Sequence, residues 1–156
     1  MPALLLVLAA GTVFGLDAVS KAWALQNAPS FAARPLVPGL LSMLLAHNTG
    51  ASFGLFAGQP LVVAVLALCV TCVVLLLWWL EGRHSFPASV SVGLILGGAA
   101  GNLWDRLLRG CVVDFLRFDF APWWPVFNVA DIATVIGVVG LGTWLLLGNT
   151  KKEAGR

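Results

Sequence analysis

Four long apolar stretches limit what this chain can fold into more than any other feature of its sequence. Crossing the hydrocarbon core of a bilayer takes about 20 consecutive apolar residues in a helix. The stretches run from about residue 3 to 25, 61 to 80, 86 to 108 and 127 to 147, in a chain of only 156 residues. We therefore expect an all-α membrane protein with four transmembrane helices, and a single integral membrane domain over residues 1–156.

The composition supports this expectation. Hydrophobic residues make up 60% of the chain and charged residues only 10%, whereas soluble domains carry about 25% charged residues. Nine basic and seven acidic residues give a net charge of +2, and no basic patch is interleaved with aromatic residues. We therefore expect membrane lipid and no nucleic acid among the partners.

The cysteines do not indicate a metal or redox site. Cys69 and Cys72 have the C-x-x-C spacing, but they lie inside a long apolar run. Metal-binding and redox cysteines need thiolates close to water or to a positive charge. No second C-x-x-C and no histidine pair follows, so we predict no metal site and read these cysteines as apolar filling of a helix.

The polar residues are distributed asymmetrically along the spans. If the chain crosses the membrane four times, the first span ends, the third ends and the fourth begins at the same membrane face. That face then carries eight polar residues, namely Asp17, Lys21, Asn102, Asp105, Arg106, Asp114, Asn128 and Asp131. An ionisable group at the bilayer centre costs at least about 2.5 to 3.5 kcal/mol, so such a cluster indicates a function.

Some of these residues have a structural explanation. Asp17 and Lys21 are four residues apart on a helix, so they face the same side and form a structural polar pair. Asn102 lies on the same side of its helix as Arg106 and organises the site with it. The alternative for Arg106 is that it only reaches towards the lipid headgroups.

Asp114 and Asp131 are harder to explain as structural residues. Both are flanked by apolar residues, and neither has a basic partner four residues away. When two carboxyl groups lie close together, one pKa is pushed up, which leaves one acid and one base at neutral pH. Such an aspartate pair can activate water against a peptide bond. Asp119, beside Arg117, is read as a surface residue.

The link over residues 27–60 is the one sizeable segment outside the membrane. Leu40 to His47 is predicted to be a strand, and Asn48-Thr-Gly50 is typical of a turn. Residues 51–57 are short and apolar, consistent with an interfacial helix or strand. The link over residues 109–125 is aromatic and apolar, as expected for chain lying on a membrane surface.

Five motifs together resemble those of the lipoprotein signal peptidase (signal peptidase II) family, and they occur in the family's order along nearly the whole chain. They are Asp17-Ala-Val-Ser-Lys21, Asn48-Thr-Gly-Ala-Ser-Phe-Gly54, Gly98-Ala-Ala-Gly-Asn-Leu-Trp-Asp-Arg106, Gly110-Cys-Val-Val-Asp-Phe115 and Phe127-Asn-Val-Ala-Asp131. One such motif is weak evidence, but five in order are specific.

The resemblance implies an activity and a fold. Members of this family remove the signal peptide from bacterial prolipoproteins, cutting before a cysteine that already carries diacylglycerol. The resemblance implies that Asp114 and Asp131 are the catalytic aspartates, and that Asn48, Gly50, Asn102, Arg106 and Asn128 bind substrate or organise the site. It also implies four helices, a small extracytoplasmic sheet and a short surface helix, with no cofactor and a prolipoprotein carrying a diacylglyceryl cysteine as substrate.

Orientation is not decided by the charges. The face with the termini has four basic residues and the polar face has four, so the positive-inside rule gives a tie. The resemblance implies a bacterial cytoplasmic (inner) membrane protein with its active site towards the periplasm or cell exterior. We also expect a monomer, although nothing in the sequence decides the oligomeric state. Two other classes remain open, a small transporter and a purely structural subunit. A transporter predicts polar residues at several depths, and a structural subunit has no use for two unpaired aspartates.

Overall fold

The structure is a computed structural model that describes residues 1–29, 32–51 and 55–154, with side chains described up to residue 147. Its elements are α1 (Pro2–Asn27), β1 (Arg34–Val37), β2 (Leu41–Asn48), α2 (Pro60–Leu77), a π-helical turn η2 (Trp78–Gly82), α3 (Phe86–Arg109), β3 (Val112–Phe118) and α4 (Val129–Ala154). Four helices are long and apolar enough to cross a membrane. The predicted four-span architecture is therefore confirmed, and its first three spans match the helices to within two residues.

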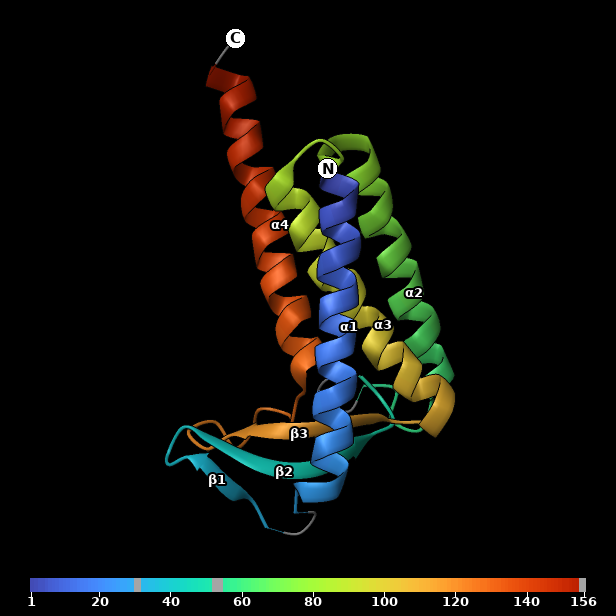
Figure 1. Cartoon of the computed structure of the whole chain (residues 1–156), viewed down its shortest axis with the longest axis vertical. Coiled ribbons are helices and arrows are strands. Elements are labelled where there is room, and N and C mark those ends of the chain that lie inside the picture. The colour runs from blue at the N-terminus through green and yellow to red at the C-terminus, as the bar shows by residue number, and fades with distance from the viewer. Residues whose placement is uncertain (30–31, 52–54, 155–156) are drawn as a thin grey trace.

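Helix α3 lies at the centre of the bundle. It packs most extensively against α1 and α4, whereas α2 contacts mainly α3. The first turn of α1 and the C-terminal end of α4 lie at one end of the molecule, and the three-stranded sheet lies at the other (Figure 1). The three helix ends that carry the predicted polar residues are thus gathered beside the sheet.

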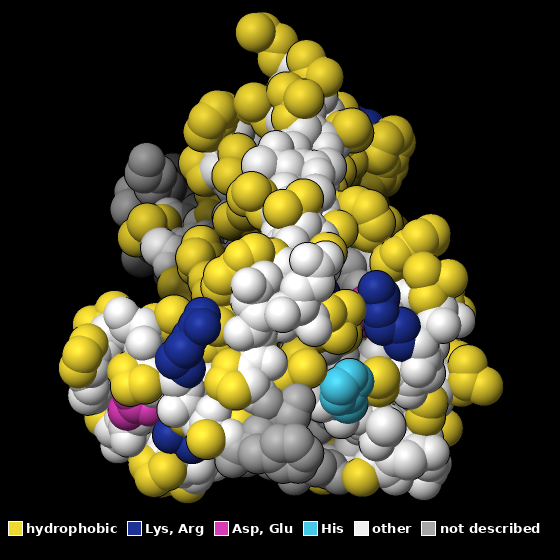
Figure 2. Space-filling view, turned by 60° about the horizontal axis from the view of Figure 1, so that its bottom comes forward, with side chains coloured by type: hydrophobic (Ala, Val, Ile, Leu, Met, Phe, Trp, Pro, Cys, Tyr) yellow, Lys and Arg dark blue, Asp and Glu magenta, His cyan; other side chains and the backbone are white. Residues whose placement is uncertain are grey.

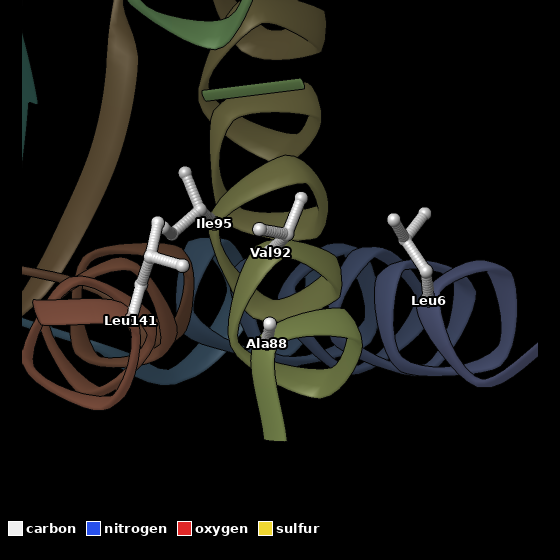
Figure 3. Packing of buried hydrophobic residues seen from close by; sticks show 5 residues of the cluster. All are labelled: Leu6, Ala88, Val92, Ile95 and Leu141. Atoms are coloured by element: carbon white, nitrogen blue, oxygen red, sulfur yellow. The ribbon is translucent and has the colours of Figure 1, made fainter. Parts of the chain in front are cut away.

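Small residues allow α3 to approach its neighbours closely. A Cβ atom at Gly93 would lie 2.6 Å from the carbonyl oxygen of Leu6 on α1, and one at Gly137 of α4 would lie 2.6 Å from that of Ser91 on α3. Such close backbone approach is the usual basis of helix association in membranes. At the end of the bundle away from the sheet, an apolar cluster joins α1, α3 and α4 (Figure 3), formed by Leu6, Ala88, Val92, Ile95 and Leu141.

The outer surface of the helices is apolar. Large hydrophobic side chains are exposed along the whole of α2, for example Leu61, Val65 and Leu76. Seen from the sheet end, most visible side chains of the bundle are hydrophobic, the basic side chains gather mainly near the sheet, and acidic side chains are scarcely visible (Figure 2). A surface of this kind is stable in lipid rather than in water.

The sheet is antiparallel, with the strand order β1-β2-β3. The predicted strand over Leu40 to His47 corresponds to β2, displaced by one residue. Strand β3 was not predicted: the link over residues 109–125 was expected only to lie on the membrane surface. An interfacial helix or strand was expected over residues 51–57, and residues 52–54 of that segment lie outside the described residues.

One interpretation of a single residue is wrong. Asp119 was expected to be a surface residue, but its carboxyl group accepts a hydrogen bond of 2.8 Å from the Ser42 hydroxyl group and pairs with Arg117 at 3.4 Å. The side chain is partly buried at the end of the sheet, where the backbone amide of Asp119 also donates to the Leu40 carbonyl group.

Candidate active site

Strand β3 places Asp114 beside the helix ends. Helix α3 ends at Arg109, and Gly110 adopts the left-handed conformation with φ of 71°, which reverses the chain into β3. A glycine is suited to this position because it has no Cβ atom to clash there. Asp114 then lies in the middle of the strand, paired with Ala46 of β2, and its side chain is only 2% exposed.

A backbone bridge brings the start of α4 to the same place. Phe127 donates to and accepts from the backbone of Leu116 at 2.9 and 2.8 Å, which ties the residue before Asn128 to β3. Asn128 Oδ1 accepts from the Asp131 amide at 2.9 Å, and the Asn128 amide donates to Asp131 Oδ2 at 3.1 Å. This reciprocal cap is the helix-start motif known as a capping box. The Asn-x-x-Asp spacing of residues 128 and 131 is the sequence signal for this cap.

Asn128 also connects the two aspartates. Its Nδ2 atom donates to Asp114 Oδ1 at 2.7 Å and to Asn102 Oδ1 at 3.0 Å, while Asn102 Nδ2 donates to Asp131 Oδ1 at 2.8 Å. Asn128 is fully buried, whereas Asp131 is partly exposed. The two carboxyl groups are therefore held by one hydrogen-bond network that is accessible from the side of Asp131.

The loop after β2 closes over Asp114. Asn48 Nδ2 donates to Asp114 Oδ2 at 3.1 Å, and Asn48 Oδ1 accepts from the amide of Gly50 at 3.0 Å. Arg106 Nη2 in turn donates to the Gly50 carbonyl group at 2.9 Å. A Cβ atom at position 50 would lie 2.7 Å from the Leu55 carbonyl oxygen, so this tight loop needs glycine.

Arg106 retains a donor for another partner. Its Nη1 atom donates to the Asn102 carbonyl group at 3.3 Å, but its Nε atom is buried without a hydrogen-bond partner among the described residues. A guanidinium group has five N–H donors in a planar fork. Arg106 can therefore hold the loop and still offer a donor to a bound molecule.

The polar pair on α1 is part of a larger cluster. Lys21 Nζ lies 2.7 Å from Asp17 Oδ2, as the helical spacing predicted, and also 3.0 Å from Asp105 Oδ2 of α3. It donates to Asn102 Oδ1 at 3.0 Å as well. Connectivity places Asp105 at this face, but its contact with Lys21 cannot be predicted from helical spacing, which carries no information on contacts between helices.

The environment of Asp114 perturbs its titration. Burial raises the pKa of the Asp114 carboxyl group to about 7, and the negative charge of Asp131 contributes to the rise. The hydrogen bonds from Asn48 and Asn128 oppose it, because they favour the ionised form. A carboxyl group that can hold a proton near neutral pH thus lies in the same hydrogen-bond network as a second carboxyl group, and acid and base catalysis by such a pair needs one protonated and one ionised member.

The structure brings all the sequence-predicted site residues together. The list comprises Asp17, Lys21, Asn48, Gly50, Asn102, Arg106, Asp114, Asn128 and Asp131. Within the described part of the chain, no three or more His, Cys, Asp and Glu side chains are grouped so as to hold a metal ion. The side-chain donors and acceptors of the site are carboxyl, amide, guanidinium and ammonium groups.

Known proteins are similar to this chain in sequence. The chain matches the family described as signal peptidase (SPase) II over residues 9–147. It is 37% identical to the lipoprotein signal peptidase of Xanthomonas campestris pv. campestris (strain 8004), an alignment that covers 98% of this chain and 95% of that protein. It is 39% identical to the lipoprotein signal peptidase of Syntrophomonas wolfei subsp. wolfei, covering 88% of this chain and 90% of the relative.

Solved structures share the fold. A bacterial membrane enzyme determined by the in meso method at 2.3 Å resolution superimposes with a TM-score of 0.85 and 26% identity, covering 94% of this chain and 90% of that one. A second, determined at 1.9 Å resolution, gives a TM-score of 0.80 at 26% identity. The resemblance carried by the five motifs is thus confirmed, and this multi-pass membrane protein, a peptidase, belongs to the signal peptidase II family.

Proposed function

We propose that the chain is an aspartyl endopeptidase that removes the signal peptide from diacylglyceryl-modified bacterial prolipoproteins. The cut falls directly before the lipid-modified cysteine. The observation that supports this most directly is the hydrogen-bond network through Asn128, which holds Asp114 and Asp131 at the sheet end of the bundle. The names of the relatives supply the substrate class.

The chemistry follows from the unequal environments of the two aspartates. Asp114 is the more strongly buried and holds a proton near neutral pH. Asp131 is partly exposed and accepts a hydrogen bond on each carboxyl oxygen, from Asn102 Nδ2 and the Asn128 amide, and in this proposal it is the ionised member of the pair. The Asp131 carboxylate takes a proton from water, the water oxygen attacks the scissile carbonyl carbon, and the Asp114 carboxyl group gives its proton to the carbonyl oxygen.

Collapse of the resulting tetrahedral species breaks the peptide bond. The leaving nitrogen takes the proton that Asp131 received, and the proton returns from the new carboxylic acid to Asp114, which restores the starting state of the pair. Arg106 lies beside the same network, and its Nε atom can donate a hydrogen bond to the substrate backbone. Gly50, whose carbonyl group is held by Arg106, helps to form the surface against which the substrate backbone lies. No covalent intermediate is needed, and no cofactor enters these steps.

The position of the site suits a lipid-modified substrate. The aspartates lie where the membrane-spanning helices meet the sheet, on β3 and in the first turn of α4, and the proposal takes this level to be that of the lipid headgroups. A cysteine that carries diacylglycerol holds the adjacent peptide bond at that level. In this proposal the protein is a monomer in the bacterial inner membrane, with the sheet end towards the periplasm or cell exterior.

The alternative of a small transporter receives no support from the structure. A transporter needs polar groups at several depths. Among the described residues, the buried charged side chains are Asp17, Lys21, Asp105 and Asp114, all at the sheet end, whereas the buried polar residues near the start of α3, Ser89 and Ser91, are uncharged. Charged groups gathered at one end suit an enzyme better than a transporter.

Processing of a defined substrate by purified protein tests the proposal. In detergent micelles, the wild-type protein is expected to cut a diacylglyceryl-modified prolipoprotein before the cysteine, as mass spectrometry of both products would show. The same prolipoprotein without the lipid is the matched control and should stay intact. Asp114→Asn and Asp131→Asn should each fold and bind substrate, with kcat lower by about 10² to 10⁴-fold. Near-normal cleavage by either variant would contradict the aspartate pair.

A further inference from the structure

The residue directly before each proposed catalytic aspartate donates its backbone amide to an acidic side chain of another element. Asp17 Oδ1 of α1 accepts from the amide of Ala130, the residue before Asp131, at 3.0 Å. Asp105 Oδ2 of α3 accepts from the amide of Val113, the residue before Asp114, at 3.1 Å. The same contact is thus made twice, once on each segment that carries a proposed catalytic carboxyl group.

Lys21 joins these two contacts. Its ammonium group lies 2.7 Å from Asp17 Oδ2 and 3.0 Å from Asp105 Oδ2. Its side chain is 3% exposed, and those of Asp17 and Asp105 are 1% and 3% exposed. Three buried charges therefore form a continuous bridge from the start of α4, through α1 and α3, to β3. We name Asp17, Lys21 and Asp105 the lysine clamp.

We propose that the lysine clamp is a positioning device that sets the separation and orientation of the Asp114 and Asp131 carboxyl groups. This inference rests on the proposed function, in which these two groups act on one water molecule. It extends the supporting role expected for Asp17 and Lys21 from stabilising the bundle to catalysis. Asp105 becomes a third member that was not assigned to the site.

Lys21 also orients the Asn102 amide. Asn102 Oδ1 accepts from both Lys21 Nζ and Asn128 Nδ2 at 3.0 Å, and a lysine ammonium group can only donate. The oxygen of the amide is therefore directed at Lys21, and the NH₂ group is left to donate to Asp131 Oδ1 at 2.8 Å. Asp131 is held as an acceptor from this side, which is the state required of the base.

The packing around the clamp leaves little freedom. A Cβ atom at Gly101 would collide with the Asp17 carboxyl group, so this carboxyl group occupies the space above a glycine of α3. Val113, the partner of Asp105, has no exposed surface. A rigid scaffold of this kind matters for catalysis, because a displacement of about 1 Å in a reacting group can cost about 10²-fold in rate.

The double variant Lys21→Met with Asp17→Asn tests the proposal with little change in charge balance. It removes one cation and one anion, and Asp105 keeps its ion pair with Arg109 at 2.6 Å. We expect folded protein whose kcat is lower by about 10 to 100-fold, with KM little changed, because substrate contacts remain while the aspartates are displaced. A role in stability alone would lower the melting temperature and leave kcat per folded molecule unchanged.

Arg109→Gln is the matched control. Arg109 binds the other oxygen of Asp105, Oδ1, and its side chain is 39% exposed, so its loss leaves both clamp contacts of Asp105 in place. Its kcat should equal that of the wild type. If the double variant does not fold, the single variant Asp105→Asn tests the clamp instead. It should fold, because Lys21 keeps its ion pair with Asp17. It should show the same loss of kcat at unchanged KM.

The outcomes separate the two proposals. Wild-type turnover in a folded double variant or in folded Asp105→Asn would overturn the clamp and leave the proposed peptidase function standing. Absence of cleavage by the wild-type protein, or cleavage by Asp114→Asn in the same assay, would instead overturn the proposed function.

Discussion

At the scale of single residues, the proposed chemistry depends on the pKa of the Asp114 carboxyl group. Its raised pKa of about 7 results first from burial and then from the charge of Asp131. An acid whose pKa is raised by folding keeps its proton to higher pH in the native state than in the unfolded chain. The native protein therefore loses stability as the pH rises from the unfolded value of about 4 towards 7.

This shift predicts the pH dependence of the reaction. Because the proposed mechanism needs a proton on Asp114, and the raised pKa belongs to the free enzyme, kcat/KM should fall as the pH is raised through about 7. The apparent value belongs to the coupled pair rather than to one residue. A pH–rate profile from pH 5 to 9 in detergent micelles measures it, and a rate that stays constant up to pH 9 would refute the assignment of Asp114 as the acid. As a control, the melting temperature of the wild type should fall relative to that of Asp114→Asn between pH 5 and about 7 and change little from this cause at higher pH.

At the scale of elements, glycines decide how closely α3 and α4 approach and hence where Asp131 lies. A Cβ atom at Gly98 of α3 would collide with Thr134 Oγ1 and the Ala130 carbonyl oxygen, near the start of α4. Further along the pair, Gly137 of α4 lies against the Ser91 carbonyl group. The helix that carries Asp131 is thus aligned by backbone contact along its length.

Two alanine substitutions on α4 test this packing. At Gly137 the new Cβ atom would lie 2.6 Å from Ser91 O, so Gly137→Ala should destabilise the protein by about 1 to 3 kcal/mol through overpacking. At Gly142 nothing lies within 4 Å, so Gly142→Ala should be neutral or stabilising by up to about 1 kcal/mol. Thermal unfolding in one detergent compares them, and equal melting temperatures for the two variants would be inconsistent with tight α3–α4 packing.

At the scale of the whole molecule, the four spans place the sheet and the termini at opposite ends. In the proposed orientation, the sheet end faces the cell exterior. Arg34 of β1 and Arg83 between α2 and α3 are exposed residues at these opposite ends, so they are suitable positions for labels.

Labelling of intact cells with a membrane-impermeant maleimide tests this orientation. In a variant without the native cysteines Cys69, Cys72 and Cys111, Arg34→Cys should react from outside the cell and Arg83→Cys only after the membrane is permeabilised. The permeabilised sample controls for reactivity of both positions. Labelling of Arg83→Cys alone in intact cells would reverse the proposed orientation.

The sequence by itself determined the four spans, the gathering of polar residues at one end and the family. Spans can be read from sequence because the bilayer imposes one length and one polarity on every crossing segment. Connectivity then requires alternate helix ends to share a face, which brought Asp17, Asn102 and Asp131 to one end without any knowledge of packing. The five motifs added the prediction that Asp114 and Asp131 form a catalytic pair, since their order and spacing were specific.

Only the tertiary structure decided how these residues are connected. Strand β3 escaped prediction because Val112 to Phe118 is mostly apolar, a pattern that suits membrane-surface chain as well as a strand whose first four residues are buried. The bridge from Asp17 to Ala130, the pairing of Lys21 with Asp105 and the contact of Asn128 with Asp114 each join elements far apart in sequence. Periodicity describes one element at a time, whereas such contacts depend on where separate elements meet in space, and that is set by the packing of the glycine-lined helices and the register of the sheet.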